Sequence, residues 1–280
     1  MSQSRGDRKN RGRHRCNKKI NIGDKRKEVV ESIDENNLIL KQFQAYAIEL
    51  DDKHDRFERI VKINRDINIE SKRIIFLLHT LDKKNKQDSI LYEAESRLQN
   101  VAQNLFKGIA QELENHCPYL YSNAYHAGLE EYIEAVTFYQ YLNNCDVGNL
   151  EEIQKALTYT IPEKSEIKTI EILITPFKYV LGIADLTGEL MRQCINNLGT
   201  GDRVSCYETC NFVRCMYKGF LGCGHMSHRG INRKIFTLKQ SLHKIENVCY
   251  TIKVRGSEIP NLSLVDVATE EENDERYKNY

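Results

Sequence analysis

Two pairs of acidic residues stand in apolar surroundings within this chain of 280 residues. Glu131 and Glu134 are three positions apart, and Asp185 and Glu189 are four apart, so each pair shares one side of an α-helix. The residues around both pairs are apolar on nearly every side, which is typical of a buried helix. A buried carboxylate is unfavourable unless it is neutralised, so these positions call for a compensating cation.

A divalent metal ion is the cation that this donor set favours. Clustered carboxylates repel one another unless a cation neutralises them, and hard oxygen ligands select Mg²⁺, Ca²⁺ or Mn²⁺. We predict a metal site with Mg²⁺, which suits phosphate chemistry, or Mn²⁺; its ligands are Glu131, Glu134, Asp185 and Glu189. Glu134 and Glu189, one from each helix, are expected to be the firmest direct ligands.

Each pair also has a purely structural explanation. Glu189 and Arg192 have the spacing of an i, i+3 ion pair, and Glu131 and Glu134 are explained equally well as half-buried acids paired with lysines elsewhere. A ferritin-like di-iron bundle would need Glu-x-x-His ligand pairs. The residues three positions after Glu131, Glu134 and Glu189 are Glu134, Thr137 and Arg192, so the sequence disfavours that class.

The elements that must position these acids are helices. No glycine or proline occurs between Gly23 and Gly108, and isoleucines and leucines recur there at three, four and seven residues, the helical period. Thr175-Pro176 has the form of an N-cap followed by a first-turn proline. We predict an all-α fold of about six or seven helices, spanning residues 36–81, 89–115, 127–143, 176–198 and 205–220 and a last one that ends at Gly256. The first is longer than a compact domain needs, which indicates an element shared between subunits.

The two ends of the chain differ in charge from the predicted helical body. The net charge is +1, but the first 27 residues are strongly basic and the last fifteen are acidic. Both ends have too few apolar residues to fold alone, so we expect a disordered basic arm at 1–33, a helical domain at 34–265 and a disordered acidic tail at 266–280. The nine cysteines, without a secretory signal, indicate reduced thiols inside the cell. The basic arm suits nuclear import or nucleic-acid contact.

Four long motifs resemble the translin family, in the order in which that family has them. They cover roughly residues 38–265 and read HDRFERIVKINRDINIESKRIIFLLH, LEEYIEAVTF, ITPFKYVLGIADLTGELMR and TLKQSLHKIENVCYTIKVRGSEIP. The resemblance implies an all-helical fold, a closed hetero-octameric shell built with translin, and a Mg²⁺-dependent endoribonuclease that cleaves single-stranded RNA. It also implies passenger-strand removal during activation of the RNA-induced silencing complex, tRNA processing, and a cytoplasmic and nuclear location.

The resemblance assigns roles to particular residues. The acids of the family's catalytic, metal-binding cluster correspond to Glu131, Glu134, Asp185 and Glu189. Its E-S-K-R stretch places a basic residue, Lys72, near the site, and Arg65 shares a helix face with Lys72, so both are expected to bind RNA. For Arg65, a surface charge on a long helix is an equally good explanation. The alternative function is a non-catalytic subunit that stabilises translin and holds RNA or single-stranded DNA, or that acts as a scaffold. The four acids argue against a subunit that only binds nucleic acid, because carboxylates near a phosphate backbone hinder binding.

One region departs from the family pattern. A cysteine- and histidine-rich segment contains Cys206, Cys210, Cys215, Cys223, His225 and His228. Its spacing is not that of a recognised zinc site. Cys206 and Cys210 fit one helix face, where cysteine behaves as a small apolar residue, so we favour a core role over zinc.

Overall fold

The computed structural model describes residues 37–81, 87–162, 167–223 and 229–255. The predicted basic arm and acidic tail, as well as His225 and His228, lie outside these residues. The chain divides into two units, residues 1–53 and 54–280. The described part of the first unit is helical from Leu38 onward and carries an ion pair between Lys53 and Glu49.

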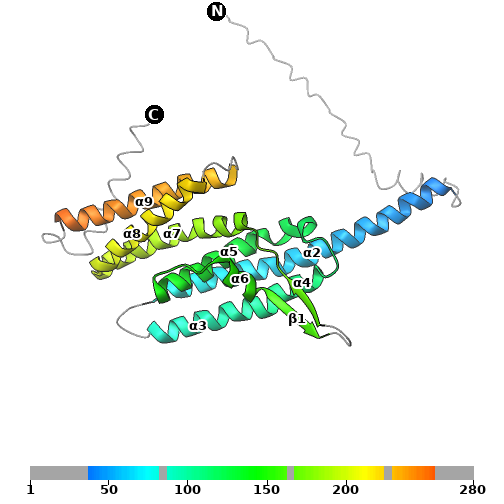
Figure 1. Ribbon diagram of the computed structural model, residues 1–280, viewed down its shortest axis with the longest axis horizontal. Coiled ribbons are helices and arrows are strands. Elements are labelled where there is room, and N and C mark those ends of the chain that lie inside the picture. Colours follow the sequence, from blue (N-terminus) through cyan, green and yellow to red (C-terminus); the bar gives the residue numbers. More distant parts are fainter. Residues whose placement is uncertain (1–36, 82–86, 163–166, 224–228, 256–280) are drawn as a thin grey trace, which may run out of the picture. The chain divides into compact units, whose positions relative to one another are not determined.

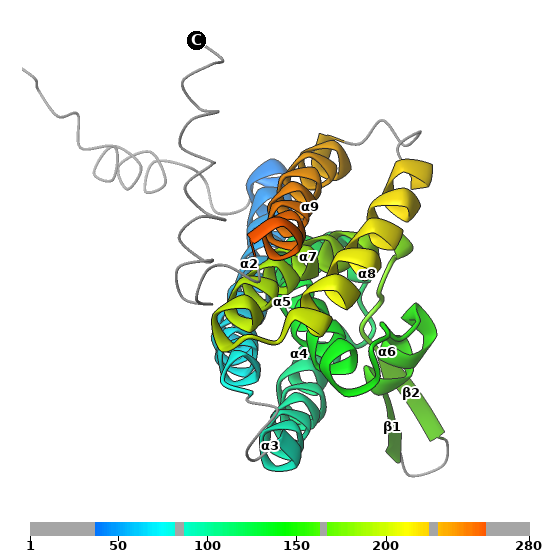
Figure 2. The same ribbon diagram turned by 90° about the vertical axis from the view of Figure 1, so that its left-hand side faces the viewer.

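The all-α prediction is confirmed, with one small hairpin added (Figures 1 and 2). The N-terminal helices are α2 (Leu38–His79), α3 (Gln87–Asn100), the π-helical turn η1 (Val101–Phe106) and α4 (Lys107–Glu112). They are followed by α5 (Pro118–Asn144), α6 (Leu150–Ala156), β1 (Thr158–Pro162) and β2 (Ile167–Glu171). The C-terminal part consists of α7 (Pro176–Thr200), α8 (Arg203–Cys223) and α9 (Arg229–Arg255), which pack against one another, and α7 also packs along α5.

The second unit has its core where the helical period predicts it. On α2, Ile60, Ile67, Ile74 and Leu78 are fully buried, at spacings of seven and four residues that keep them on one side of the helix. They join a core to which α3, α5, α7, α8 and α9 also contribute. No helix in the described ranges has the length and apolar content that a membrane span requires.

Helix α7 begins and ends as the sequence predicts. The Thr175 hydroxyl accepts a hydrogen bond from the backbone N–H of Lys178 at 3.3 Å, and Pro176 occupies the first turn, where no intrahelical N–H bond is lost. Gly201 ends the helix at φ 85°, a conformation that glycine adopts without steric cost. The local sequence therefore sets the phase in which α7 presents Asp185 and Glu189.

Helix α5 is longer than the predicted 127–143. It begins at Pro118 and passes through Gly128, whose N–H lies 2.9 Å from Asn64 Oδ1 on α2. A Cβ at Gly128 would lie 2.3 Å from that same oxygen, so the glycine permits the close approach of α2 and α5. Tertiary packing outweighs the low helix propensity of glycine here.

The segment between α5 and α7 contains a hairpin that the sequence did not predict. In this segment, α6 is followed by the antiparallel pair β1–β2, in which Tyr159 lies opposite Ile170. Tyr159 and Ile170 are both buried, and the Tyr159 hydroxyl donates to the carbonyl of Ala102 at 2.7 Å. Long-range packing of this kind has no signal in local periodicity.

Candidate active site

The four predicted acids come together between α5 and α7. Helix α5 contributes Glu131 and Glu134, and α7 contributes Asp185 and Glu189. The helices can approach closely because α7 has Gly182 at the crossing, where an added Cβ would lie 2.7 Å from Ile133 of α5.

Glu134 is the most buried of the four acids, with 8% of its surface exposed. Burial, followed by repulsion from the other three site acids, raises the pKa of its carboxyl to about 8. Within the described ranges its carboxylate makes no hydrogen bond and no ion pair. The electrostatic coupling shows that the four acids lie close together, and Glu134 is the one that forms no ion pair in the described ranges.

The other three acids are paired with cationic side chains. Lys72 Nζ of α2 lies 3.8 Å from Glu131 Oε2, and burial still raises the pKa of the Glu131 carboxyl in spite of that lysine. Lys234 Nζ of α9 contacts both carboxylate oxygens of Asp185. The structural explanation based on lysines therefore applies to Glu131, but not to Glu134.

Glu189 has two basic neighbours, Arg192 and His79. Arg192 lies 3.1 Å away, so the i, i+3 ion pair that we considered is present. His79 Nε2, at the end of α2, lies 2.5 Å from Glu189 Oε2, while His79 Nδ1 faces Gln193 Oε1 at 3.3 Å. Both ring nitrogens face oxygen acceptors, so both contacts are hydrogen bonds when the ring carries two protons.

Three residues of the site were not predicted from the sequence. Lys234 comes from α9, and Glu130 of α5 lies close enough to Asp185 and Lys234 for their charges to affect its pKa, which burial raises. His79 follows Lys72 by seven residues, so the helical phase that singled out Lys72 could have indicated it. For Lys234, no local signal exists, because only the packing of α9 on α7 brings it to Asp185.

The comparisons with known proteins agree on the family. The translin family model matches residues 55–256. Translin-associated protein X of Rattus norvegicus is 42% identical over 242 residues, covering 82% of this chain and 83% of the relative. The homolog from Schizosaccharomyces pombe is 27% identical over 237 residues, covering 82% of this chain and 95% of that protein.

The chain belongs to the translin family.

Solved structures share the translin-family fold. The AfC3PO–duplex RNA complex superposes with a TM-score of 0.59 at 18% identity, covering 78% of this chain and all of that one. Apo-NeC3PO superposes with a TM-score of 0.56 at 19% identity, covering 77% of this chain and 96% of that one. At these identities, the similarity establishes the fold.

The two predicted RNA-binding residues of this translin-family chain have different surroundings. Lys72 is exposed and borders the acids through Glu131. Arg65 is also exposed, but it makes no ion pair with a site acid in the part of the chain that the structure describes. The assignment of both residues to RNA binding stays a prediction.

The acids suit a hard divalent cation in their chemistry, although their side chains are not preassembled around one. Within the described ranges, no group of three or more His, Cys, Asp or Glu side chains is arranged to hold a metal ion. The donors are carboxylates, the ligands that Mg²⁺ and Mn²⁺ prefer, and buried Glu134 forms no ion pair within the described residues. Metal binding there would require the carboxylates to turn away from Lys234 and His79.

Among the described residues, the cysteines are not arranged to hold a metal ion. Cys206 and Cys210 are buried, as expected of residues in a core, whereas Cys215 is exposed. They lie near Cys194 of α7 and Cys249 of α9, and the Cys249 thiol donates to the carbonyl of Cys206 at 3.5 Å. Burial raises the pKa of the Cys249 thiol to about 12, so it stays protonated at neutral pH.

Proposed function

We propose that this chain is the catalytic subunit of a metal-dependent endoribonuclease that works in a hetero-oligomer with translin, as an octameric shell. The observation that carries the proposal is the convergence of four carboxylates from α5 and α7, with Glu134 buried and lacking a counter-charge. The identity to Translin-associated protein X supports the choice of partner. The fold shared with a C3PO–duplex RNA complex supports an RNA substrate.

In the proposed reaction, the acids would hold Mg²⁺, or Mn²⁺ in its place. Glu134 and Glu189 would be direct ligands, and Glu131 and Asp185 would complete the site or orient the water. Bound metal would supply an activated water and neutralise charge on the scissile phosphate. Lys72 is exposed beside Glu131, where its ammonium group would bind a phosphate of the RNA strand. His79 would fix the carboxylate of Glu189 by hydrogen bonding and is itself oriented by Gln193.

The family resemblance extends the proposal to biology. Single-stranded RNA is the proposed substrate, in passenger-strand removal during activation of the RNA-induced silencing complex and in tRNA processing. We propose cytoplasmic and nuclear locations for the chain, with the basic arm as the import signal.

A second candidate function is a non-catalytic subunit that holds single-stranded RNA or DNA, or acts as a scaffold. The cations paired with three of the acids favour it, because a fully paired acid cluster needs no metal. The unpaired, buried Glu134 favours the nuclease instead.

The test uses the complex of the full chain with translin, assayed on a short single-stranded RNA with Mg²⁺ and with EDTA. We expect Glu134→Ala or Glu189→Ala to abolish cleavage while size-exclusion chromatography shows unchanged assembly. Mg²⁺ should also raise the thermal unfolding midpoint of the wild-type complex more than that of Glu134→Ala, because the ligand binds the native state. Glu58→Gln, an exposed acid of α2, is the matched control.

Cleavage at the wild-type rate in both alanine variants would overturn the nuclease proposal. Loss of the assembled complex in both variants would instead support the structural explanation, in which the acids are ion-pair partners. RNA binding by a wild-type complex that does not cleave with Mg²⁺ or Mn²⁺ would favour the second candidate function.

A further inference from the structure

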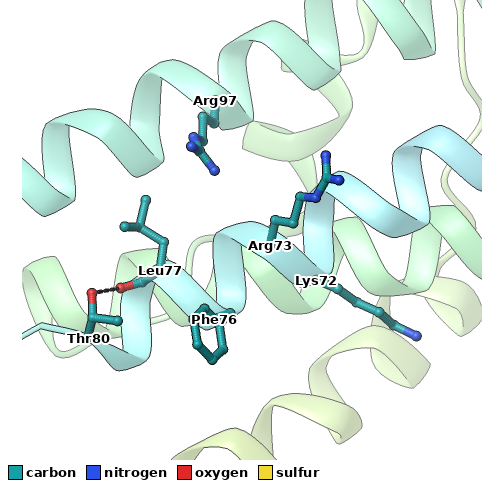
Figure 3. Close-up of a pocket in the computed structure, with 6 residues that line it drawn as sticks. All are labelled: Lys72, Arg73, Phe76, Leu77, Thr80 and Arg97. Atoms are coloured by element: carbon teal, nitrogen blue, oxygen red, sulfur yellow. Dashed lines mark hydrogen bonds between the residues drawn. The ribbon is translucent and has the colours of Figure 1, made fainter.

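A pocket between α2 and α3 lies beside the candidate active site and shares Lys72 with it (Figure 3). Its volume is about 390 Å³, and it is lined by Lys72, Arg73, Phe76, Leu77, Thr80 and Arg97. These residues provide three cations and no carboxylate. A pocket lined in this way favours an anionic ligand that also has an apolar face.

Phe76 is the unusual residue of this pocket. It is 73% exposed, although its neighbours Ile74, Ile75 and Leu78 on α2 are buried. It follows Lys72 by one helical turn and precedes His79 by three residues. Lys72 contacts Glu131 and His79 contacts Glu189, so Phe76 lies on α2 between the two residues of that helix that reach the site acids.

The two arginines are held at the pocket by acidic partners outside it. Glu70 lies 3.4 Å from Arg73 and 3.7 Å from Arg97, and thereby links α2 to α3. Glu93 pairs with Arg97 at 2.8 Å. Figure 3 shows Arg97 extending from α3 toward α2, and Lys72 and Arg73 extending from α2. Each arginine retains N–H donors beyond those in its ion pairs, because a guanidinium group has five.

We propose that Phe76 is a stacking platform for an unpaired base of the RNA strand, with Arg73 and Arg97 binding the adjoining phosphates. Aromatic rings combined with cations that follow the backbone are the usual means of binding single-stranded nucleic acid. Stacking on a side chain requires a base that is free of its complement, so the platform selects single strands over duplexes. Lys72, shared by the pocket and the acids, makes the RNA path continuous into the active site.

This inference rests on the proposed function only for the identity of the ligand, and it is tested without catalysis. The full chain, in complex with translin, is titrated in EDTA with a 15-nucleotide single-stranded RNA that carries fluorescein at one end and 2-aminopurine within the strand. Anisotropy measures affinity, and quenching of the 2-aminopurine reports stacking. The variants are Phe76→Ala, Phe76→Leu and Phe76→Tyr, with Tyr92→Ala, a 75% exposed aromatic of α3 outside the pocket, as the matched control.

We expect Phe76→Ala and Phe76→Leu to weaken binding about 5- to 100-fold, which corresponds to the loss of one base–aromatic stack. Both should abolish the quenching, Phe76→Tyr should restore it, and Tyr92→Ala should bind as the wild type does. Arg97→Ala should reduce the slope of log affinity against log salt, because one phosphate contact is lost.

Unchanged affinity and quenching in Phe76→Leu would overturn the inference and leave the nuclease proposal intact. Loss of assembly in Phe76→Ala and Phe76→Leu would also overturn it, because the ring would then be covered by another protein subunit. If the wild-type complex quenches the 2-aminopurine fluorescence but does not cleave RNA, the stacking platform would be supported and the nuclease proposal would be wrong.

Discussion

At the scale of single residues, the site is defined by how its charges are balanced. Lys72 offsets Glu131 and Lys234 offsets Asp185, although α2 and α9 are far apart in the sequence. Glu134 forms no ion pair in the described ranges, and its burial and the repulsion of the other acids outweigh the effect of Lys234, so its pKa rises to about 8. An acid of this kind releases its proton when a cation arrives, which couples metal binding to pH.

We predict that Glu134→Gln alters the pH dependence of stability. The folded-state pKa of about 8 lies above the ordinary value of 4.5, so the folded protein retains a proton that the unfolded chain releases between these values. Wild-type stability should therefore fall as pH rises from 5 to 8, by on the order of 1–3 kcal/mol more than in Glu134→Gln. Thermal unfolding midpoints are measured in EDTA across that range, with Glu58→Gln as control. The midpoint of Glu134→Gln relative to that of the wild type should rise toward pH 8. Parallel curves for the two proteins would contradict the prediction.

At the scale of the helices, a glycine at the crossing of α5 and α7 allows them to pack closely. Two glycines of α7 differ in their surroundings. Gly182 faces Ile133 and the carbonyl of Glu130, whereas a Cβ at Gly188 would have no neighbour within 4 Å among the described residues. The same residue type therefore has a packing role at one position and leaves open space at the other.

We predict opposite effects for two identical substitutions in α7. Gly182→Ala should destabilise the protein by about 1–3 kcal/mol, since the methyl group forces apart the helices that carry the acids. Gly188→Ala should stabilise it by up to about 1 kcal/mol through helix propensity alone. Thermal unfolding of both variants tests the pair, and equal shifts would show that the helix crossing is not as close as described. RNA cleavage should fall in Gly182→Ala, because α5 must move.

Ser71 of α2 is a second element-scale feature. It is fully buried, and its hydroxyl has no hydrogen-bond partner in the described part of the chain. An unsatisfied buried hydroxyl is unfavourable, and alanine is the better helix former, so Ser71→Ala should raise the free energy of unfolding by about 0.5–1 kcal/mol. Denaturation with urea measures the change. A loss of stability would reveal that the hydroxyl has a partner, such as a bound water.

At the scale of the whole molecule, apolar surface remains uncovered. Large apolar side chains are exposed on α8 and α9, including Val204, Leu221, Phe236 and Tyr250. Others, including Leu38 and Phe43, are exposed in the first unit. Surfaces of this kind are typical of subunits that are buried in an assembly.

We therefore predict that the isolated chain is poorly soluble and that the proposed complex with translin is soluble. Expressed by itself, it should aggregate, and co-expressed with translin it should form a closed hetero-oligomer of defined mass. Light scattering at micromolar concentration distinguishes the two results. A monodisperse monomer of the isolated chain would contradict the proposed obligate assembly.

Deletion of residues 1–33 tests whether the basic arm is needed for cleavage or only for nuclear import and RNA affinity. The four acids and Lys72 all lie beyond this segment, so Mg²⁺-dependent cleavage of a short RNA should be nearly unchanged. Nuclear accumulation should be lost, and any loss of RNA affinity should shrink as salt rises, because it would come from counterion release. Loss of cleavage at saturating RNA would place the basic arm in the catalytic chamber.

The sequence alone determined the helices and the phase of their side chains. The periodic isoleucines of α2, the Thr175-Pro176 start of α7 and the two acid pairs depend on spacing within one helix, where neighbours three and four residues apart share a face. The all-α class and the four acids could be predicted for this reason. Arg65 shares a helix face with Lys72, but it makes no ion pair with a site acid in the described part of the chain.

Only the tertiary structure decided which charges meet. Lys234 reaches Asp185 across 49 residues and His79 reaches Glu189 across 110, and no local pattern encodes pairs so distant. The β1–β2 hairpin likewise depends on a tyrosine that bonds to the carbonyl of Ala102 in η1. Pairing energies of this kind arise only when packing removes water and brings the partners within a few ångströms, which is why the counter-charges of the site, and the lack of one at Glu134, were beyond prediction from sequence.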